Sequence, residues 1–195
     1  MYKQLVVSHY EQDLAWIEVA SNSLDVVVYD KSGKDSTYNK LKNVGREPHS
    51  YMHHIIENYN SLAEWTIFSQ DNPFEHVDNW SEVIVGDESV WEQVANSKYK
   101  GGYYFANKGI LASNQNGAPD HPGLPIAQLW EQTFVEKCPE YLEFVPSCHC
   151  IVHKDNIHVR SIQFYKNIKH ILETNHLSPW SLERYISYIF NPDYR

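Results

Sequence analysis

Short apolar strands alternate with helices over the first third of the chain, and this alternation restricts the possible folds more than any other feature. Strands are predicted at residues 4–9 (QLVVSH), 24–30 (LDVVVYD) and 65–69 (WTIFS), which are short runs rich in β-branched residues. Helices are expected over roughly 11–20 and over 50–60, the second following Pro48. Strands that alternate with helices are typical of an α/β domain with a parallel sheet covered by helices.

Each of the three predicted strands ends in polar residues. These ends are Ser8-His9-Tyr10, Tyr29-Asp30 and Ser69-Gln70-Asp71. Parallel strands end at the same edge of a sheet, and ligands of open α/β sheets bind at that edge. The sequence therefore predicts a binding site built from these three ends.

The whole chain, residues 1–195, is expected to form a single domain. Its length is typical of one domain, and the sequence contains no internal repeat or linker. Residues 100–125, rich in Gly, Asn and Pro, are expected to form a long loop that acts as an acceptor-side flap carrying Tyr103 and Tyr104. The remaining expectations are helices at 79–99 (in part), 126–137, 160–174 and 179–190, and a strand in 144–157 with a turn at 154–156.

Composition limits the class of partner. A net charge of −9 and a pI near 5.6 argue against binding to a nucleic-acid backbone, which needs a concentrated basic surface. No stretch approaches the roughly 20 apolar residues of a membrane span, and the first apolar run stops after three residues, unlike a signal peptide. Three irregularly spaced cysteines do not form a disulfide framework, so a cytoplasmic protein is expected.

Two segments have the chemistry to hold a diphosphate. Gly45-Arg46-Glu47 precedes a helix whose N-terminus attracts phosphate, and Arg46 can bind phosphate through two parallel hydrogen bonds. Asp71, between the amides of Gln70 and Asn72, is placed to bind Mg²⁺ or Mn²⁺. A surface Arg–Glu pair and an Asp-Asn-Pro turn explain the same residues without a ligand.

Other polar clusters favour structural roles. His49, His53 and His54 form a histidine cluster in which His49 and His53 share a helical face. The pattern of zinc proteases is missing, so packing and hydrogen bonding behind the phosphate site are expected. In Cys148-His149-Cys150 the cysteines alternate with the histidine, which predicts buried cysteines on one face and His149 on the other. Glu183 begins a helix, where it interacts favourably with the dipole or reaches a bound sugar.

The segments VVSHYEQDLAWI, NVGREPHSYMHHIIENY, WTIFSQDNPFEH, CIVHKDNI, RSIQFYKNI and LERYISYIFN resemble a domain-of-unknown-function family of fungi, bacteria and large DNA viruses. That family is similar to nucleotide-diphospho-sugar transferases of the GT-A fold, with a mixed, mostly parallel sheet flanked by helices. It also resembles the glycosyltransferase domain with which chlorella viruses decorate their capsid glycoprotein.

The resemblance implies a UDP-sugar donor, a glycan or glycoprotein acceptor and a Mn²⁺ or Mg²⁺ ion. By the same resemblance, His9 and Tyr10 would contact the nucleoside, Arg46 the diphosphate or base, and Asp71 the metal. The GT-A pattern has two carboxylates where this chain has Gln70-Asp71-Asn72, so a metal would draw on Asp30 or another group as well.

A glycosyltransferase stabilises charge on the leaving diphosphate, a role for the metal and Arg46. An inverting enzyme also needs a base near the acceptor, for which Glu183, Asp120 and His149 are the candidates, whereas a retaining enzyme does not. Two alternatives stay open: a metal-dependent hydrolase that uses the histidines and Asp71, and a sugar- or nucleotide-binding module without turnover.

Overall fold

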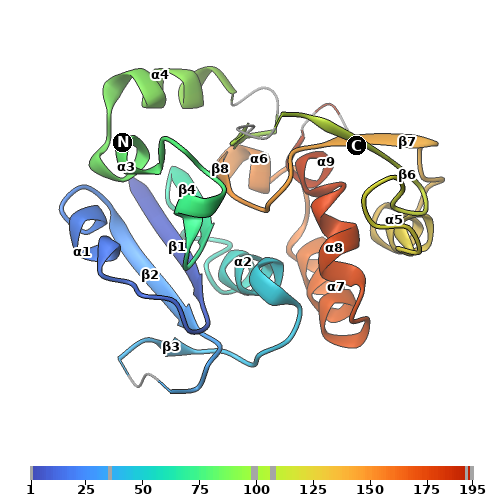
Figure 1. Ribbon diagram of the computed structural model, residues 1–195, viewed down its shortest axis with the longest axis horizontal. Coiled ribbons are helices and arrows are strands. Elements are labelled where there is room, and N and C mark those ends of the chain that lie inside the picture. Colours follow the sequence, from blue (N-terminus) through green and yellow to red (C-terminus); the bar gives the residue numbers. More distant parts are fainter. Residues whose placement is uncertain (1, 35–36, 98–100, 106–108, 192, 194–195) are drawn as a thin grey trace.

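The computed structural model describes residues 2–34, 37–97, 101–105, 109–191 and 193, which form a mixed α/β fold around a six-stranded sheet (Figure 1). The sheet has the strand order β3-β2-β1-β4-β8-β5. Its strands are β1 (Lys3–His9), β2 (Asp25–Asp30), β3 (Asn39–Lys40), β4 (Trp65–Gln70), β5 (Tyr103–Tyr104) and β8 (Cys150–His153). A separate antiparallel pair consists of β6 (Leu111–Asn114) and β7 (Tyr141–Phe144).

The helices lie on both faces of this sheet (Figure 1). One face carries α1 (Trp16–Ala20), α3 (Trp80–Val85) and α4 (Glu88–Ser97). The other carries α2 (Arg46–Glu57), α5 (Ile126–Phe134), α7 (Ile162–Thr174), α8 (Ser178–Glu183) and α9 (Ile186–Phe190). The short helix α6 (Lys154–Ile157) follows β8, and a 3₁₀ turn, η1 (Pro73–Glu75), follows β4.

The centre of the sheet is parallel, as the sequence predicts. β1 pairs in parallel with β2 on one side and with β4 on the other. β8 then pairs antiparallel with β4 and with β5, so the sheet is mixed. Alternate side chains of β1 enter different cores: Val6 lies in the core under α2, and Leu5 and Val7 lie in the core under α1, α3 and α4.

Several expectations for single elements are wrong. Residues 11–15 are not helical, and α1 begins only at Trp16. The stretch 100–125 contains β5 and β6, and Tyr103 and Tyr104 pair with β8, so they do not form a flap; residues 100 and 106–108 lie outside the described part. The expected turn at 154–156 is α6, and the last helix is divided into α8 and α9. Glu183 is therefore the last residue of α8 and does not begin a helix, so the predicted interaction with the helix dipole is wrong.

Two other features concern the whole chain. All three cysteines are buried and free. The burial of Cys148 and Cys150 agrees with the prediction from their alternation with His149. Within the described residues, no helix combines the length and the apolar character that a membrane crossing requires.

Candidate functional site

The three polar strand ends meet at one edge of the sheet, which confirms the prediction from their sequence. Ser8 lies opposite Tyr29 of β2 and opposite Gln70 of β4. The chain passes from β1 to β2 on one side of β1 and later places β4 on its other side. The order therefore reverses at β1, and such a switch point is where open α/β sheets bind ligands.

A pocket of about 230 Å³ opens at this point, and we call it the switch-point pocket. It brings together four of the predicted residues, Tyr10, Arg46, Gln70 and Asp71. The full lining is Ser8, Tyr10, Lys31, Asn43, Arg46, Glu47, Gln70 and Asp71.

A wider hollow of about 480 Å³ begins on the His9 side of the same strand end, and we call it the His9 hollow. Tyr38 and the α1 segment form its other walls, and the His9 and Tyr38 rings meet edge to face at 6.1 Å between centroids. His9 lines the hollow whereas Ser8 and Tyr10 line the pocket, so the end of β1 separates the two spaces.

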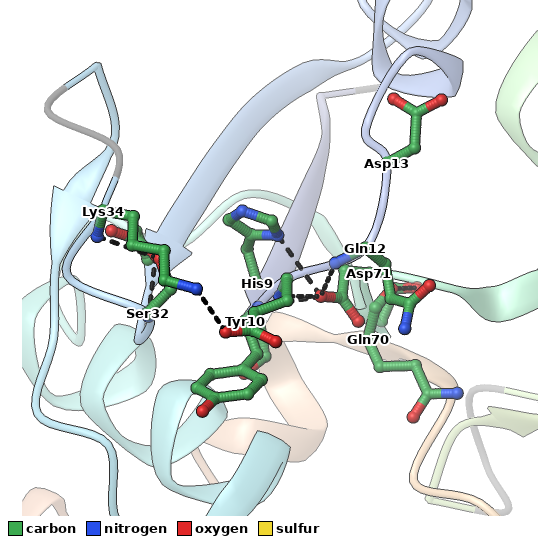
Figure 2. A network of polar contacts seen from close by, with 12 residues as sticks. His9, Tyr10, Gln12, Asp13, Ser32, Lys34, Gln70 and Asp71 are labelled. Carbon is green, nitrogen blue, oxygen red and sulfur yellow. Dashed lines mark hydrogen bonds and ion pairs between the residues drawn. The ribbon is translucent and has the colours of Figure 1, made fainter.

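Asp71 holds the loop that follows β1. Its Oδ2 atom accepts hydrogen bonds from the backbone N–H groups of Tyr10 (2.7 Å), Glu11 (3.3 Å) and Gln12 (3.2 Å). The Nδ1 atom of His9 lies 3.2 Å from the same oxygen. Figure 2 shows these contacts converging on one side of the carboxylate, while the Gln70 side chain extends away from the loop.

These contacts bear on the metal that the resemblance implies. A divalent cation binds lone pairs of oxygen, and the Oδ2 lone pairs of Asp71 already accept from N–H donors. Across the described ranges, no three His, Cys, Asp or Glu side chains gather into a group that could hold a metal ion. The described donor set does not fit a metal held by the protein alone, and a metal at Asp71 stays a prediction.

The N-terminus of α2 borders the switch-point pocket and begins with an unusual backbone turn. Gly45 has φ +63° and Arg46 has φ +49°, both in the left-handed region. A Cβ atom on Gly45 would lie 2.9 Å from the Cβ atoms of His49 and Leu172. Close packing of α2 on α7 therefore accounts for this glycine, and its predicted contact with a ligand stays a prediction.

Lys31 is the buried cation of this pocket. The residue follows β2 directly and is only 6% exposed. Its Nζ atom donates to the carbonyl oxygens of Val44, at 2.6 Å, and of Arg46. Burial lowers the pKa of Lys31 to about 8; the Glu47 carboxylate opposes this shift and the Arg46 guanidinium adds to it.

Arg46 lies at the mouth of the pocket with its side chain about half exposed. Its Nε atom is 3.4 Å from Oε2 of Glu47, and its guanidinium lies 5.2 Å from the Trp180 ring centroid. A small cavity of about 60 Å³ links these three residues to Glu183. The structure therefore brings Glu183 beside Arg46, and its contact with a sugar stays a prediction.

The carboxylate of Glu183 is, however, also part of the local structure. Its Oε1 atom accepts from the backbone N–H of Ser147 at 2.6 Å, and its Oε2 atom pairs with the buried Arg184. Arg184 also contacts His121 and lies over the Phe144 ring. A change at Glu183 would therefore disturb the packing of α8 on the segment around β7.

His149 is buried and is not among the residues that line either space at the strand ends. Its Nε2 atom is 3.4 Å from the Gln70 N–H, which places the ring proton on Nδ1, toward Ser147 Oγ at 3.0 Å. Burial, with a smaller effect of His76, lowers the pKa of His149 to about 3. The ring packs near Trp80 whereas Cys148 and Cys150 enter the α2-side core, which confirms the predicted opposite faces.

The remaining candidates have local partners or exposed positions. Asp30 is buried and accepts from the N–H and hydroxyl of Ser32, which closes the turn after β2. Asp120 is exposed on the turn after β6. His49 and His54 are buried, and they contact Glu173 and Tyr29 respectively at 3.1 Å, in agreement with the packing role predicted for this histidine cluster.

Sequence reasoning missed two residues of the pocket, Lys31 and Asn43; it named Ser8 among the strand ends and Glu47 beside Arg46, but gave neither a role at the site. Lys31 directly follows the recognised strand end Tyr29-Asp30, so the strand-end rule extended by one residue would have found it. Glu47 has the sequence pattern of a helix-dipole partner, and its place on the pocket wall depends on how α2 packs against the sheet.

A family model described as protein of unknown function (DUF3431) matches residues 5–193 of the chain. Comparison with curated proteins finds no significant match, and neither does comparison with solved structures.

Proposed function

The chain belongs to the family described as protein of unknown function (DUF3431), and we propose that it is a glycosyltransferase that moves a sugar from a UDP-sugar to a glycan or glycoprotein acceptor. The observation that carries this proposal is the switch-point pocket, where Lys31, Arg46 and the start of α2 surround one space. Side-chain cations and a helix N-terminus are the groups that bind phosphates. The finer assignment to the GT-A fold is part of the proposal and rests on the resemblance.

The two spaces at the end of β1 suit the two halves of the donor. The diphosphate would lie in the switch-point pocket, and the nucleoside would lie in the His9 hollow beside the rings of His9 and Tyr38. The sugar would extend toward Trp180, since aromatic rings bind the apolar faces of sugars. Positive groups already in place around the leaving diphosphate would stabilise the charge that develops on it.

The acceptor would approach from the side of α8. Among the three bases considered from the sequence, Glu183 borders the cavity next to Arg46, whereas His149 is buried and Asp120 is exposed on the turn after β6. A retaining reaction would need no such base, so the proposal does not depend on Glu183. The resemblance also implies Mn²⁺ or Mg²⁺, which would supply further positive charge at the diphosphate.

Thermal unfolding of the protein with UDP and UDP-sugars, each with and without Mn²⁺, tests the proposal. UDP is expected to raise the melting temperature because it binds only the folded state. Arg46→Ala should reduce that rise while the unliganded melting temperature stays nearly unchanged, because the Arg46 side chain is half exposed. Lys34→Ala, on an exposed lysine outside the pocket, is the control.

Two measurements separate the proposal from its two alternatives: release of UDP from a UDP-sugar, and the zinc content of the purified protein. A binding module would be stabilised by UDP but would release none, and a metal-dependent hydrolase would carry tightly bound zinc after purification. Absence of any stabilisation by UDP or UDP-sugars, in either metal condition, would contradict the proposed function.

A further inference from the structure

A buried lysine on the wall of a pocket calls for an explanation. Lys31 is only 6% exposed to solvent, yet its hydrogen-bond acceptors are two neutral carbonyl groups. Burying an ammonium group without a directly paired carboxylate costs free energy. Groups with such environments concentrate at functional sites, where a ligand supplies the missing opposite charge.

The Lys31 ammonium has capacity for a ligand. It has three N–H groups, and the carbonyls of Val44 and Arg46 take two of them. Within the described residues, this leaves one N–H for an anion in the pocket that Lys31 lines. The left-handed backbone at Gly45 and Arg46 belongs to the segment that carries both carbonyls, so the lysine and the start of α2 form one unit.

Asp71, the carboxylate expected to hold a metal, is bound by N–H groups of the protein. Asp71 accepts three backbone N–H groups and lies next to His9, and its task in the structure is to hold residues 10–12. The positive charge that faces the pocket comes from Lys31 and Arg46, on two different elements.

We propose that Lys31 and Arg46, together with the N-terminus of α2, bind the diphosphate of the donor directly and thereby take the place of a divalent cation. The inference rests on the proposed function for the identity of the donor, but its ligand chemistry is that of any diphosphate. Lys31 contributes a buried charge in a fixed position. The Arg46 guanidinium can move to meet the ligand, since its side chain is half exposed and, among the described residues, forms an ion pair only with its neighbour Glu47.

Glu47 makes the proposal easy to distinguish from metal binding. Its carboxylate lines the same pocket and lies 3.4 Å from Arg46 Nε. For direct binding, this negative charge repels the diphosphate and competes for Arg46. For metal-mediated binding, the same carboxylate is a potential metal ligand. Removal of its charge therefore changes affinity in opposite directions under the two mechanisms.

The experiment is calorimetric titration of the full chain with inorganic pyrophosphate at pH 7, in EDTA and then with excess Mn²⁺. We expect binding in EDTA. Lys31→Met should weaken it about tenfold or more, because a charge-assisted hydrogen bond contributes about 1.5–3 kcal/mol. Lys34→Met should leave the affinity unchanged, and Glu47→Gln should tighten it severalfold.

In the pyrophosphate titrations, two outcomes would overturn the inference: binding of pyrophosphate only when Mn²⁺ is present, or weaker binding of pyrophosphate by Glu47→Gln. If Lys31→Met does not fold, Glu47→Gln decides, because it removes a charge from a partly exposed side chain. UDP titrations in the same two buffers separate this inference from the proposed function. UDP binding that depends on Mn²⁺ would contradict the inference alone, whereas pyrophosphate binding without any UDP binding would contradict the proposed function alone.

Discussion

Lys31 connects the affinity of the switch-point pocket to pH. Its pKa is lowered to about 8 by burial, so the unliganded protein loses this charge as the pH rises through that value. An anion in the pocket favours the protonated form, and by linkage the protonated form favours the anion. We predict that affinity for a UDP-sugar is highest below pH 8 and falls about tenfold between pH 7 and pH 9, measured by titration calorimetry.

Other charged groups around Lys31 set the controls for this pH profile. Arg46, Glu47, Asp71 and Tyr10 are the other charged or titratable side chains on the pocket wall. Lys31→Met should give a lower and nearly flat profile, and Tyr10→Phe should keep the slope of the wild type. An unchanged slope in Lys31→Met would show that another group is responsible.

At the residue scale, the sequence identified which residues lie together at the pocket better than it identified their hydrogen-bond partners and their burial. Strand-end logic selected Tyr10, Gln70 and Asp71 correctly as neighbours. It did not predict that Asp71 would accept three N–H groups from residues about 60 positions away, nor that Lys31 would be buried. Both facts depend on long-range packing, and a lysine in a turn is ordinarily exposed.

At the scale of elements, the start of α2 depends on a glycine for two separate reasons. Gly45 and Gly33 have similar backbone angles, φ +63° and +71°, but only Gly45 is crowded, because a Cβ atom there would lie 2.9 Å from His49 and from Leu172. We predict that Gly33→Ala costs about 1 kcal/mol, the cost of the left-handed backbone. Gly45→Ala should cost about 2–4 kcal/mol, because overpacking against α7 adds to it.

Urea unfolding of the two alanine variants measures this difference directly. Gly33→Ala is the matched control, since a Cβ there meets none of the described atoms within 4 Å. Equal losses in the two variants would mean that α2 and α7 adjust to the methyl group without cost. In Gly45→Ala we also expect weaker binding of pyrophosphate, because the displaced turn carries the carbonyl partners of Lys31.

Elements with strong local patterns were predictable, and those defined by distant partners were not. β1, β2 and β4 are continuous apolar runs, and α2 has helical periodicity after Pro48. Residues 11–12 fall in a segment with a helical pattern, but their N–H groups bond to Asp71 instead. β5 has only two residues and exists because β8 offers its edge, which no local pattern reveals.

At the scale of the whole molecule, the alternation of strands and helices was sufficient to predict a helix-covered sheet with a site at its carboxyl edge. The antiparallel strand β8 was not predictable from that alternation, because its position between β4 and β5 comes from the return of the distant second half of the chain. That return also places α5, α7, α8 and α9 in one core with α2.

The two cores of the molecule share the same strands, and this predicts cooperative unfolding. Val6 and Phe68 enter the α2-side core, and their neighbours Val7 and Ile67 enter the other. Separating the strands would expose both cores together, so we expect a single transition in urea. All three cysteines lie in the α2-side core, where Trp130 is buried and against which Trp180 packs. Trp65, Trp80 and Trp91 are buried in the other core, and Trp16 packs against it.

Thiol pulse labelling and tryptophan fluorescence test this cooperativity when both are followed across one urea series in a Trp130→Phe, Trp180→Phe variant, whose remaining tryptophans belong to the other core. Before the transition the thiols should be unreactive, because they are buried and burial raises the pKa of Cys138 to about 11. The two midpoints should coincide. Thiol labelling at a lower urea concentration than the fluorescence change would show that the α2-side core opens first, and the start of α2, with the proposed diphosphate contacts, would then belong to a separately unfolding part of the chain.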